Sequence, residues 1–167
     1  MKGYKIAVGI DRKYGPFLCM VELETHPKAT IIKPYLEPQI FGGISLPSRR
    51  TDMAAIKSVT PLKAPHKNWN GKAYSLFQLC KPYQNFVRIV YEEGVLVTSR
   101  LNTDESEPCG LGIHFFESEE DATLYLKEDI CFYLENSIRY VKKLWNIGKA
   151  DGSPYASKRK LLKELSK

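Results

Sequence analysis

The feature that most constrains the fold is an apolar stripe that follows Ser118. Its members recur at three- and four-residue spacing, and they are Ala122, Tyr125, Leu126, Ile130, Tyr133, Leu134, Ile138, Val141 and Trp145. This spacing predicts an amphipathic helix of about 25 residues, whose apolar side must lie against another layer of structure. One long helix and two shorter ones both fit, with Gly148 and Gly152 as natural ends.

The start of this helix is marked by the residues around it. Ser118 and Asp121 have the spacing of a capping box, in which the hydroxyl accepts a bond from an early backbone N–H and the carboxylate reaches back to the cap. Glu119 and Glu120 suit the positive end of the helix dipole. We therefore expect a helix that begins directly after Ser118.

Short strand-like runs precede the helix. They lie at residues 5–10, 16–24, 29–32, 54–60, 73–79, 86–91, 95–99 and 112–116. Residues 11–15 have the composition of a hairpin loop and 92–94 that of a tight turn, whereas proline, glycine and asparagine at 34–47 and 61–71 predict two long connections. The predicted fold is α+β: a mixed, largely antiparallel sheet packed against a long C-terminal helix or helix pair, with a short basic terminal helix.

The net charge is concentrated at the C-terminus. The 167 residues suit a single α+β domain at 1–148, followed by a basic tail at 149–167 that has the pattern of a short helix. From residue 142 onward eight Lys or Arg stand against two acids, which accounts for the whole net charge of +6. Lys158, Arg159 and Lys160 are the candidate contacts to nucleic acid or to an acidic surface of a partner. A solvated tail that keeps the protein soluble is the other interpretation.

The cysteines indicate a reducing compartment. The four of them, at positions 19, 80, 109 and 131, stand far apart and form no C-x-x-C pair, so free thiols are expected. No metal site is expected, because only Cys109 and His114 are close in sequence. No apolar run reaches the roughly 18 residues of a membrane helix, and residues 1–5 lack the pattern of a signal peptide. We expect neither membrane contact nor secretion.

Histidine and arginine supply the candidate contacts to a ligand or partner. The chain has no P-loop, G-x-S-x-G, H-E-x-x-H or dinucleotide-binding glycine motif. His114 lies in a predicted strand and should project opposite to its two neighbours, where it either caps local backbone groups or lines a cleft. Arg49 and Arg50 end the first long connection, where they either bind an anion or a carboxylate or form a solvated pair. Tyr91 belongs to a group of aromatic residues that core and hairpin packing explain better than base stacking.

Residues 109–125 resemble a known family. They read CGLGIHFFESEEDATLY and are similar to the signature C-x-x-G-I-H-F-F-x-[ST]-x-E-E-A-x-x-Y of an uncharacterised domain family of large DNA viruses and phages, with Asp121 in place of the second Glu. Residues 50–59 and 86–97 resemble two further segments of that family. The resemblance extends over residues 5–126 and implies a viral origin, in a family whose activity is not established.

Residues 112–125 are also similar to the glycine, strand and serine-initiated helix of ADP-ribosyltransferase folds. That resemblance implies an NAD-using enzyme with a cleft near His114. In such a cleft Arg49 or Arg50 would hold a phosphate, and Tyr91 would stack on a ring. The chain departs from the pattern at His114, where those enzymes have Phe or Tyr, and after the helix, where no strand clearly offers their acidic residue.

Two functions are expected on these grounds. The first is a non-enzymatic viral protein that acts by protein–protein contacts with other viral proteins, as a minor virion or capsid-associated structural component without a cofactor. Long irregular loops suit that role, because they can become ordered on contact with a partner. Such a protein would reside in the host cytoplasm or in the virion. The second is an ADP-ribosyltransferase-like enzyme that binds NAD or a nucleotide.

Overall fold

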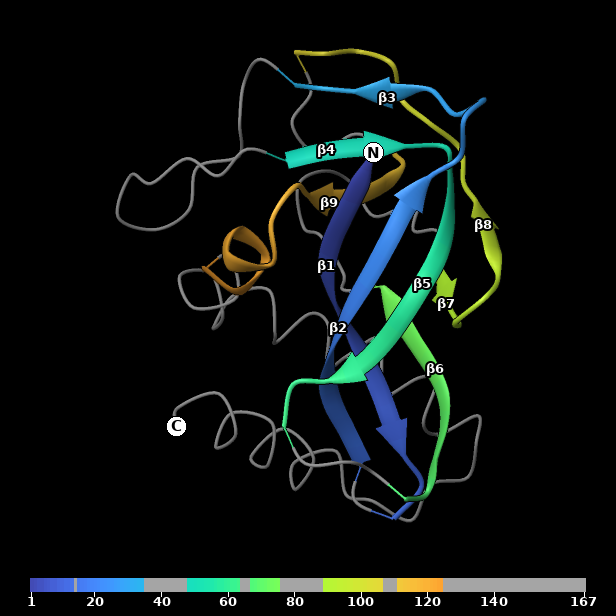
Figure 1. The fold of residues 1–167 in the computed structure, drawn as a ribbon, viewed down its shortest axis with the longest axis vertical. Coiled ribbons are helices and arrows are strands. Elements are labelled where there is room, and N and C mark those ends of the chain that lie inside the picture. The colour runs from blue at the N-terminus through green and yellow to red at the C-terminus, as the bar shows by residue number, and fades with distance from the viewer. Residues whose placement is uncertain (14, 35–47, 64–66, 76–88, 107–110, 125–167) are drawn as a thin grey trace.

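The computed structural model of the chain describes residues 1–13, 15–34, 48–63, 67–75, 89–106 and 111–124. These residues form a curled, largely antiparallel sheet shaped like half a barrel, together with the start of one short helix (Figure 1). The strands are β1 (Lys2–Asp11), β2 (Gly15–Thr25), β3 (Ile31–Ile32), β4 (Ser48–Thr51), β5 (Met53–Pro61), β6 (Trp69–Ser75), β7 (Val90–Tyr91), β8 (Leu96–Thr98) and β9 (Ile113–Phe116). Every pairing among them is antiparallel.

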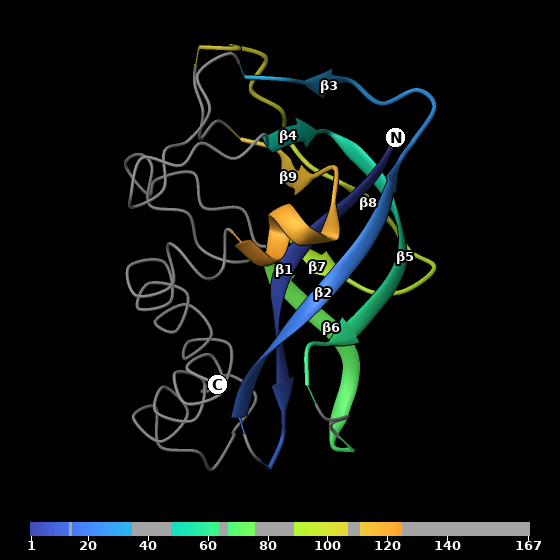
Figure 2. The ribbon, with the colours of Figure 1, turned by 60° about the vertical axis from the view of Figure 1, so that its left-hand side comes forward.

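Strand β1 is the centre of the sheet. It pairs with β2 along its whole length, from Lys2 opposite Glu24 to Asp11 opposite Gly15, as the predicted hairpin requires. Its other edge is divided, because β9 pairs with it at Tyr4 and β6 pairs with its C-terminal half. The sheet therefore forks at β1 into two branches, which Figures 1 and 2 show leaving opposite ends of the strand.

One branch and the β2 side together make the half-barrel. The strand order is β3-β4-β9-β1-β2-β5-β8, and β6 with β7 continues from the second half of β1. The turn between β7 and β8 is fastened to β5, since Gly94 N–H donates to Ile56 O at 2.9 Å and Ile56 N–H donates to Val95 O at 3.0 Å. Gly94 has a φ of 81°, a backbone conformation that favours glycine, and the predicted tight turn is confirmed.

The core lies on the inner face of the curl. It is formed by buried side chains from both branches: Ala7, Phe17, Cys19, Val21, Leu23, Ala54, Ile56, Ala73, Ile89, Tyr91, Val97, Ile113 and Phe115. Apart from Lys5, the residues from Gly3 to Gly9 that β1 turns toward this core are small. A Cβ on Gly3 would collide with the ring of Phe115, and one on Gly9 would lie 2.5 Å from Cζ of Phe17. The absence of side chains at these two positions lets aromatic rings lie directly on the strand.

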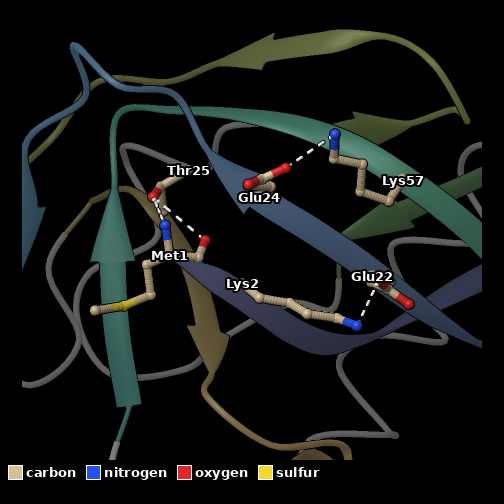
Figure 3. Close-up of polar contacts among 6 residues, drawn as sticks. All are labelled: Met1, Lys2, Glu22, Glu24, Thr25 and Lys57. Atoms are coloured by element: carbon tan, nitrogen blue, oxygen red, sulfur yellow. Dashed lines mark hydrogen bonds and ion pairs between the residues drawn. The ribbon is translucent and has the colours of Figure 1, made fainter.

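The opposite, outer face of the hairpin has an apolar end and a charged end. Ile6, Val8, Leu18 and Met20 are all buried on it. Toward the other end, Lys2 pairs with Glu22 and Lys57 pairs with Glu24, each at 2.9 Å (Figure 3). The Lys57 ammonium holds the pKa of Glu24 below its ordinary value. Exposed pairs of this kind contribute little stability but keep this end of the face polar.

Strand β5 contains an irregularity that the sequence pattern does not predict. The register shifts between Glu22 and Leu23, so that Leu23 faces Ile56 while Glu22 faces Ser58. Lys57 is the extra residue of this β-bulge, and it is exposed. As a result Ile56 and Val59, three positions apart, both pack on the core.

The predicted helix start is confirmed. The Ser118 hydroxyl accepts a hydrogen bond from Asp121 N–H at 3.0 Å, residues 119–124 are helical, and Ala122 is completely buried. Figure 2 shows this segment lying against the sheet beside β1. The remainder of the predicted helix, its proposed ends and the basic tail with Lys158, Arg159 and Lys160 lie outside the described residues.

Two predicted boundaries are wrong. Arg49 and Arg50 were expected at the end of a loop, but they lie in β4, which pairs with β3 on one side and β9 on the other. The four residues of β4 lack apolar alternation, but they form a strand because β3 and β9 pair with its two edges. Strand β6 begins at Trp69, inside the second expected connection, and continues through Gly71 with a φ of 80°. Residues 35–47, 76–88 and 107–110 lie outside the described residues.

We expect Gly3→Ala to lower the free energy of unfolding by about 1–3 kcal/mol, since the new methyl group displaces the Phe115 ring from β1. Urea denaturation of the full chain measures this cost. In a Phe115→Leu background the same substitution should cost much less, because the smaller side chain leaves room. Equal costs in both backgrounds would contradict the proposed packing.

Candidate functional site

Pairing between β4 and β9 brings three of the predicted site residues, Arg49, Arg50 and His114, onto two neighbouring strands. Arg50 lies opposite His114, and Arg49 lies opposite Phe115. Directly opposed residues in an antiparallel pair share a face of the sheet, so Arg50 and His114 lie on one face and Arg49 lies on the other, with the core residue Phe115. The expectation of a solvated arginine pair is wrong, because Arg49 is 8% exposed and Arg50 is fully buried.

The Arg50 guanidinium is bound to a crossing loop. Its Nε donates to the carbonyl oxygen of Asn102 at 2.8 Å, and Nη2 donates to that of Asp104 at 2.5 Å. Burying a guanidinium is costly, and bonds to backbone carbonyl oxygens with partial negative charge offset that cost. Arg50 thus joins β4 to Asn102 and Asp104, which lie 52 and 54 positions further along the chain.

The loop that receives Arg50 is folded on itself. Asp104 N–H donates to Asn102 Oδ1, and Ser106 donates to Asp104 Oδ1 through both its N–H and its hydroxyl. Asn102 N–H donates to Leu111 O, which brings the loop back to the start of β9. Gly112 follows with a φ of 147°, and a Cβ there would lie 3.3 Å from Thr51 O. Only glycine permits this close approach to β4.

His114 occupies the position that strand alternation predicts. Ile113 and Phe115 on either side are buried in the core, whereas His114 is partly exposed and lies on the Arg50 face. The strand that carries His114, β9, lies between β4 and β1. The role of His114 as a ligand or partner contact stays a prediction.

Arg49 makes an ion pair at the rim of the sheet. Its Nε lies 3.0 Å from Glu117 Oε1, and its Nη1 donates to Ser48 O at 3.0 Å. The Glu117 side chain is 48% exposed, so this charge pair reaches solvent. The buried Arg49 is thus paired with a group that is accessible from outside.

Tyr91 is a core residue, as the packing interpretation predicted. It is completely buried, and Ala73 lies opposite it on β6. The Lys5 ammonium lies 4.8 Å from the centre of its ring. An ammonium over an aromatic face is stabilised by the ring quadrupole. One face of the Tyr91 ring is therefore covered by the Lys5 side chain.

Lys5 is a residue with unusual chemistry that sequence reasoning missed. It lies on the same face of β1 as Ala7, opposite Val21, and burial lowers the pKa of its amine to about 7. The alternation of β1 contains the signal, because Lys5 falls in the row of Gly3, Ala7 and Gly9 that faces the core. The structure brings Lys5 to Tyr91 and Arg50 to His114, as two separate pairs.

Other candidate chemistry is limited in the described part of the chain. Cys19 is a buried free thiol, as predicted, and burial raises its pKa to about 12. Within the described ranges no group of three or more His, Cys, Asp or Glu side chains is placed to hold a metal ion. No helix among these residues has the length and apolar character needed to cross a membrane.

Comparison with known proteins identifies no relative of the chain: no family model, no curated protein and no solved structure matches it. The functional argument therefore depends on the residues and their geometry. The viral-family and ADP-ribosyltransferase resemblances stay predictions.

We expect Arg50→Met to lower the free energy of unfolding by about 2–4 kcal/mol, because it removes two hydrogen bonds that a fully buried charged group donates to the loop. Arg49→Met removes the same charge from the adjacent position but breaks a pair that reaches solvent, so its cost should be about 1 kcal/mol or less. Chemical denaturation of the two variants tests the difference. Similar losses would show that Arg50 does not anchor the loop.

Lys5 should make stability depend on pH. The unfolded lysine holds its proton up to about pH 10.4 and the folded one only to about 7, so the unfolded state binds more protons and stability rises with pH above 7. The rise is measured below about pH 8.5, because above it the unfolded Cys19 thiol ionises while the folded one does not, which acts in the opposite direction. Below about pH 7 the folded state holds the charged amine in its buried position, so the full destabilisation by Lys5 is present. Lys5→Met should abolish the rise and add about 1–3 kcal/mol near pH 7. Lys57→Met, at an exposed lysine, is the matched control and should leave the rise intact.

Proposed function

We propose that this protein is non-enzymatic and acts by protein–protein contacts, as a minor virion or capsid-associated component of a virus. The observation that carries this proposal is the state of two candidate ligand contacts. Arg50 is buried and bound to backbone carbonyl oxygens, and Tyr91 is buried beneath the Lys5 ammonium. Side chains used in this way hold the fold together and are not presented to a substrate.

The viral assignment is supported by the resemblance of residues 109–125 to the signature of the viral domain family. The described part of that segment contains Gly112 in its close approach to β4, the strand β9 and the helix start at Ser118. Each of these features has a structural role in joining the sheet to the helix. The signature residues are therefore explained by the fold that the family would share, and they do not require a shared catalytic site.

The proposed partners are other viral proteins. Among the described residues, accessible groups proposed for such contacts are the Glu117 carboxylate, which reaches solvent beside the buried Arg49, and the exposed apolar side chains Val95 and Leu96. The basic tail, with Lys158, Arg159 and Lys160, is a second proposed contact, either to nucleic acid or to an acidic protein surface. Host cytoplasm and virion are the proposed locations.

The ADP-ribosyltransferase-like alternative has one supporting observation. A glycine, a strand and a serine-capped helix follow one another at Gly112, β9 and Ser118, and His114 is partly exposed on that strand. An enzyme of this kind would bind NAD or a nucleotide near His114. Tyr91 would have to leave the core to stack on a ring, and Arg50 would have to leave the loop to hold a phosphate.

Mass spectrometry of purified particles of the virus that encodes the chain tests the proposal. We expect the protein in a fixed ratio to the major capsid protein, retained after washing at high salt. NAD at about a hundred times a typical dissociation constant should leave the melting temperature unchanged, whereas binding to the native state would add about 2.7 kcal/mol.

The opposite pair of results would overturn the proposal. That pair is absence from particles together with a rise in melting temperature on adding NAD. His114→Ala should then abolish the rise, while His26→Ala serves as the control, since its imidazole accepts a bond from Lys28 N–H in the turn after β2.

A further inference from the structure

Strand β6 contains a bulge near its start. Trp69 lies opposite Asp11 of β1 and Ala73 lies opposite Gly9, so residues 70–72 of β6 stand against the single residue between those two positions of β1. Gly71, in the middle, has a φ of 80°, which is the conformation of glycine in one common class of β-bulge. Residues 70–72 therefore lie outside the regular register of the two strands.

The bulge contains an Asn-Gly pair that is open to solvent. Asn70 is the only asparagine of the 167-residue sequence that is followed by glycine, and it is exposed. A Cβ added to Gly71 would meet no atom within 4 Å. The backbone nitrogen of Gly71 thus has no side chain of its own beside it, and the space next to it is free for water.

The Asn70 side chain is folded over the peptide that follows it. Its Oδ1 accepts a hydrogen bond from Lys72 N–H at 3.0 Å, which closes an Asx-turn. Closing this turn brings Asn70 Cγ round to the backbone nitrogen of Gly71. The Lys72 N–H also points at the oxygen that would gain negative charge if this nitrogen attacked Cγ, and a donor in that place stabilises the transition state.

Asn102 is a comparison residue within the same chain. Its Oδ1 accepts a hydrogen bond from Asp104 N–H at 2.9 Å, so it makes the same kind of turn. The residue after it is Thr103, whose branched side chain stands beside the backbone nitrogen and hinders an attack. The two asparagines share the turn, and the following glycine distinguishes Asn70.

We propose that Asn70 is a site of spontaneous deamidation, at which the side-chain amide is converted to a carboxylate through a cyclic imide. Gly71 N loses its proton to solvent and forms a bond to Asn70 Cγ. A proton from solvent goes to the side-chain nitrogen, the bond between that nitrogen and Cγ breaks, and ammonia leaves. Water then opens the imide at either carbonyl and leaves aspartate or isoaspartate at position 70. Water is the only co-reactant, and the proposal does not depend on contacts with viral proteins.

The isoaspartate product acts on the packing of β6. Trp69 Nε1 donates to Lys72 O at 2.8 Å, and the Trp69 ring lies edge-on to Phe17 with the ring centroids 5.2 Å apart. Isoaspartate adds a methylene group to the main chain between Trp69 and Lys72, so it lengthens the segment that this hydrogen bond spans. The aspartate product keeps the chain length and adds only a charge near Lys72, whose ammonium pairs with Glu92 at 3.6 Å.

Peptide mapping by mass spectrometry of the full chain, incubated at mildly alkaline pH, tests the proposal. The peptide with Asn70 should gain the mass difference between an amide and a carboxylic acid and separate into aspartate and isoaspartate forms. The peptide with Asn102 should stay unchanged in the same sample. Conversion should be faster in the folded chain than in guanidinium chloride, because unfolding removes the Asx-turn.

Gly71→Ala is the matched variant. Its methyl group meets nothing in the fold, but it stands beside the attacking nitrogen, so conversion of Asn70 should slow about tenfold or more. Circular dichroism confirms that this variant is folded, and Asn70→Gln, with a longer side chain, should abolish the conversion. The proposal is overturned by an unmodified Asn70, by equal conversion at Asn102, by faster conversion in guanidinium chloride or by a rate that Gly71→Ala leaves unchanged.

Discussion

The small residues on the inner face of β1 are the constraint on which the rest of the structure depends. Gly3 and Gly9 let the rings of Phe115 and Phe17 lie on the strand, and these rings come from β9 and β2, which pair with opposite edges of β1. The strand has three partners because β9 and β6 share the edge that β2 leaves open. The curl of the sheet follows, since the inner face is filled by large side chains from the outer strands.

Arg50 and Lys5 show two ways in which this sheet accommodates a positive charge below its surface. Arg50 has a planar group with several donors, and backbone carbonyl oxygens of a crossing loop receive them. Lys5 has an aromatic face for its charge, and burial lowers its pKa. The first arrangement fastens a loop to the sheet, while the second places a polar group inside the half-barrel at a cost to stability.

Much of the framework could be predicted from sequence, for local reasons. Alternation and turn composition located the β1–β2 hairpin, and the serine before two glutamates located the helix start, because these signals act within a few residues. Strand β4 escaped prediction because its sequence, Ser-Arg-Arg-Thr, has no apolar row and is held by partners on both sides. The bulge at Lys57 and the division of the β1 edge escaped because both depend on residues far apart in the chain. At the candidate site, alternation correctly placed His114, but it could not foresee that Arg50 lies opposite it.

The divided edge of β1 has a consequence for biosynthesis. The hairpin of β1 and β2 leaves the ribosome before β6 and β9, the strands that fill the free side of β1, and β9 ends at residue 116. Until that point in translation, an apolar ribbon with an unfilled side is exposed to other nascent chains. Such non-local pairing slows folding and favours aggregation, so the protein's yield should depend on chaperones that shield its N-terminal hairpin during synthesis.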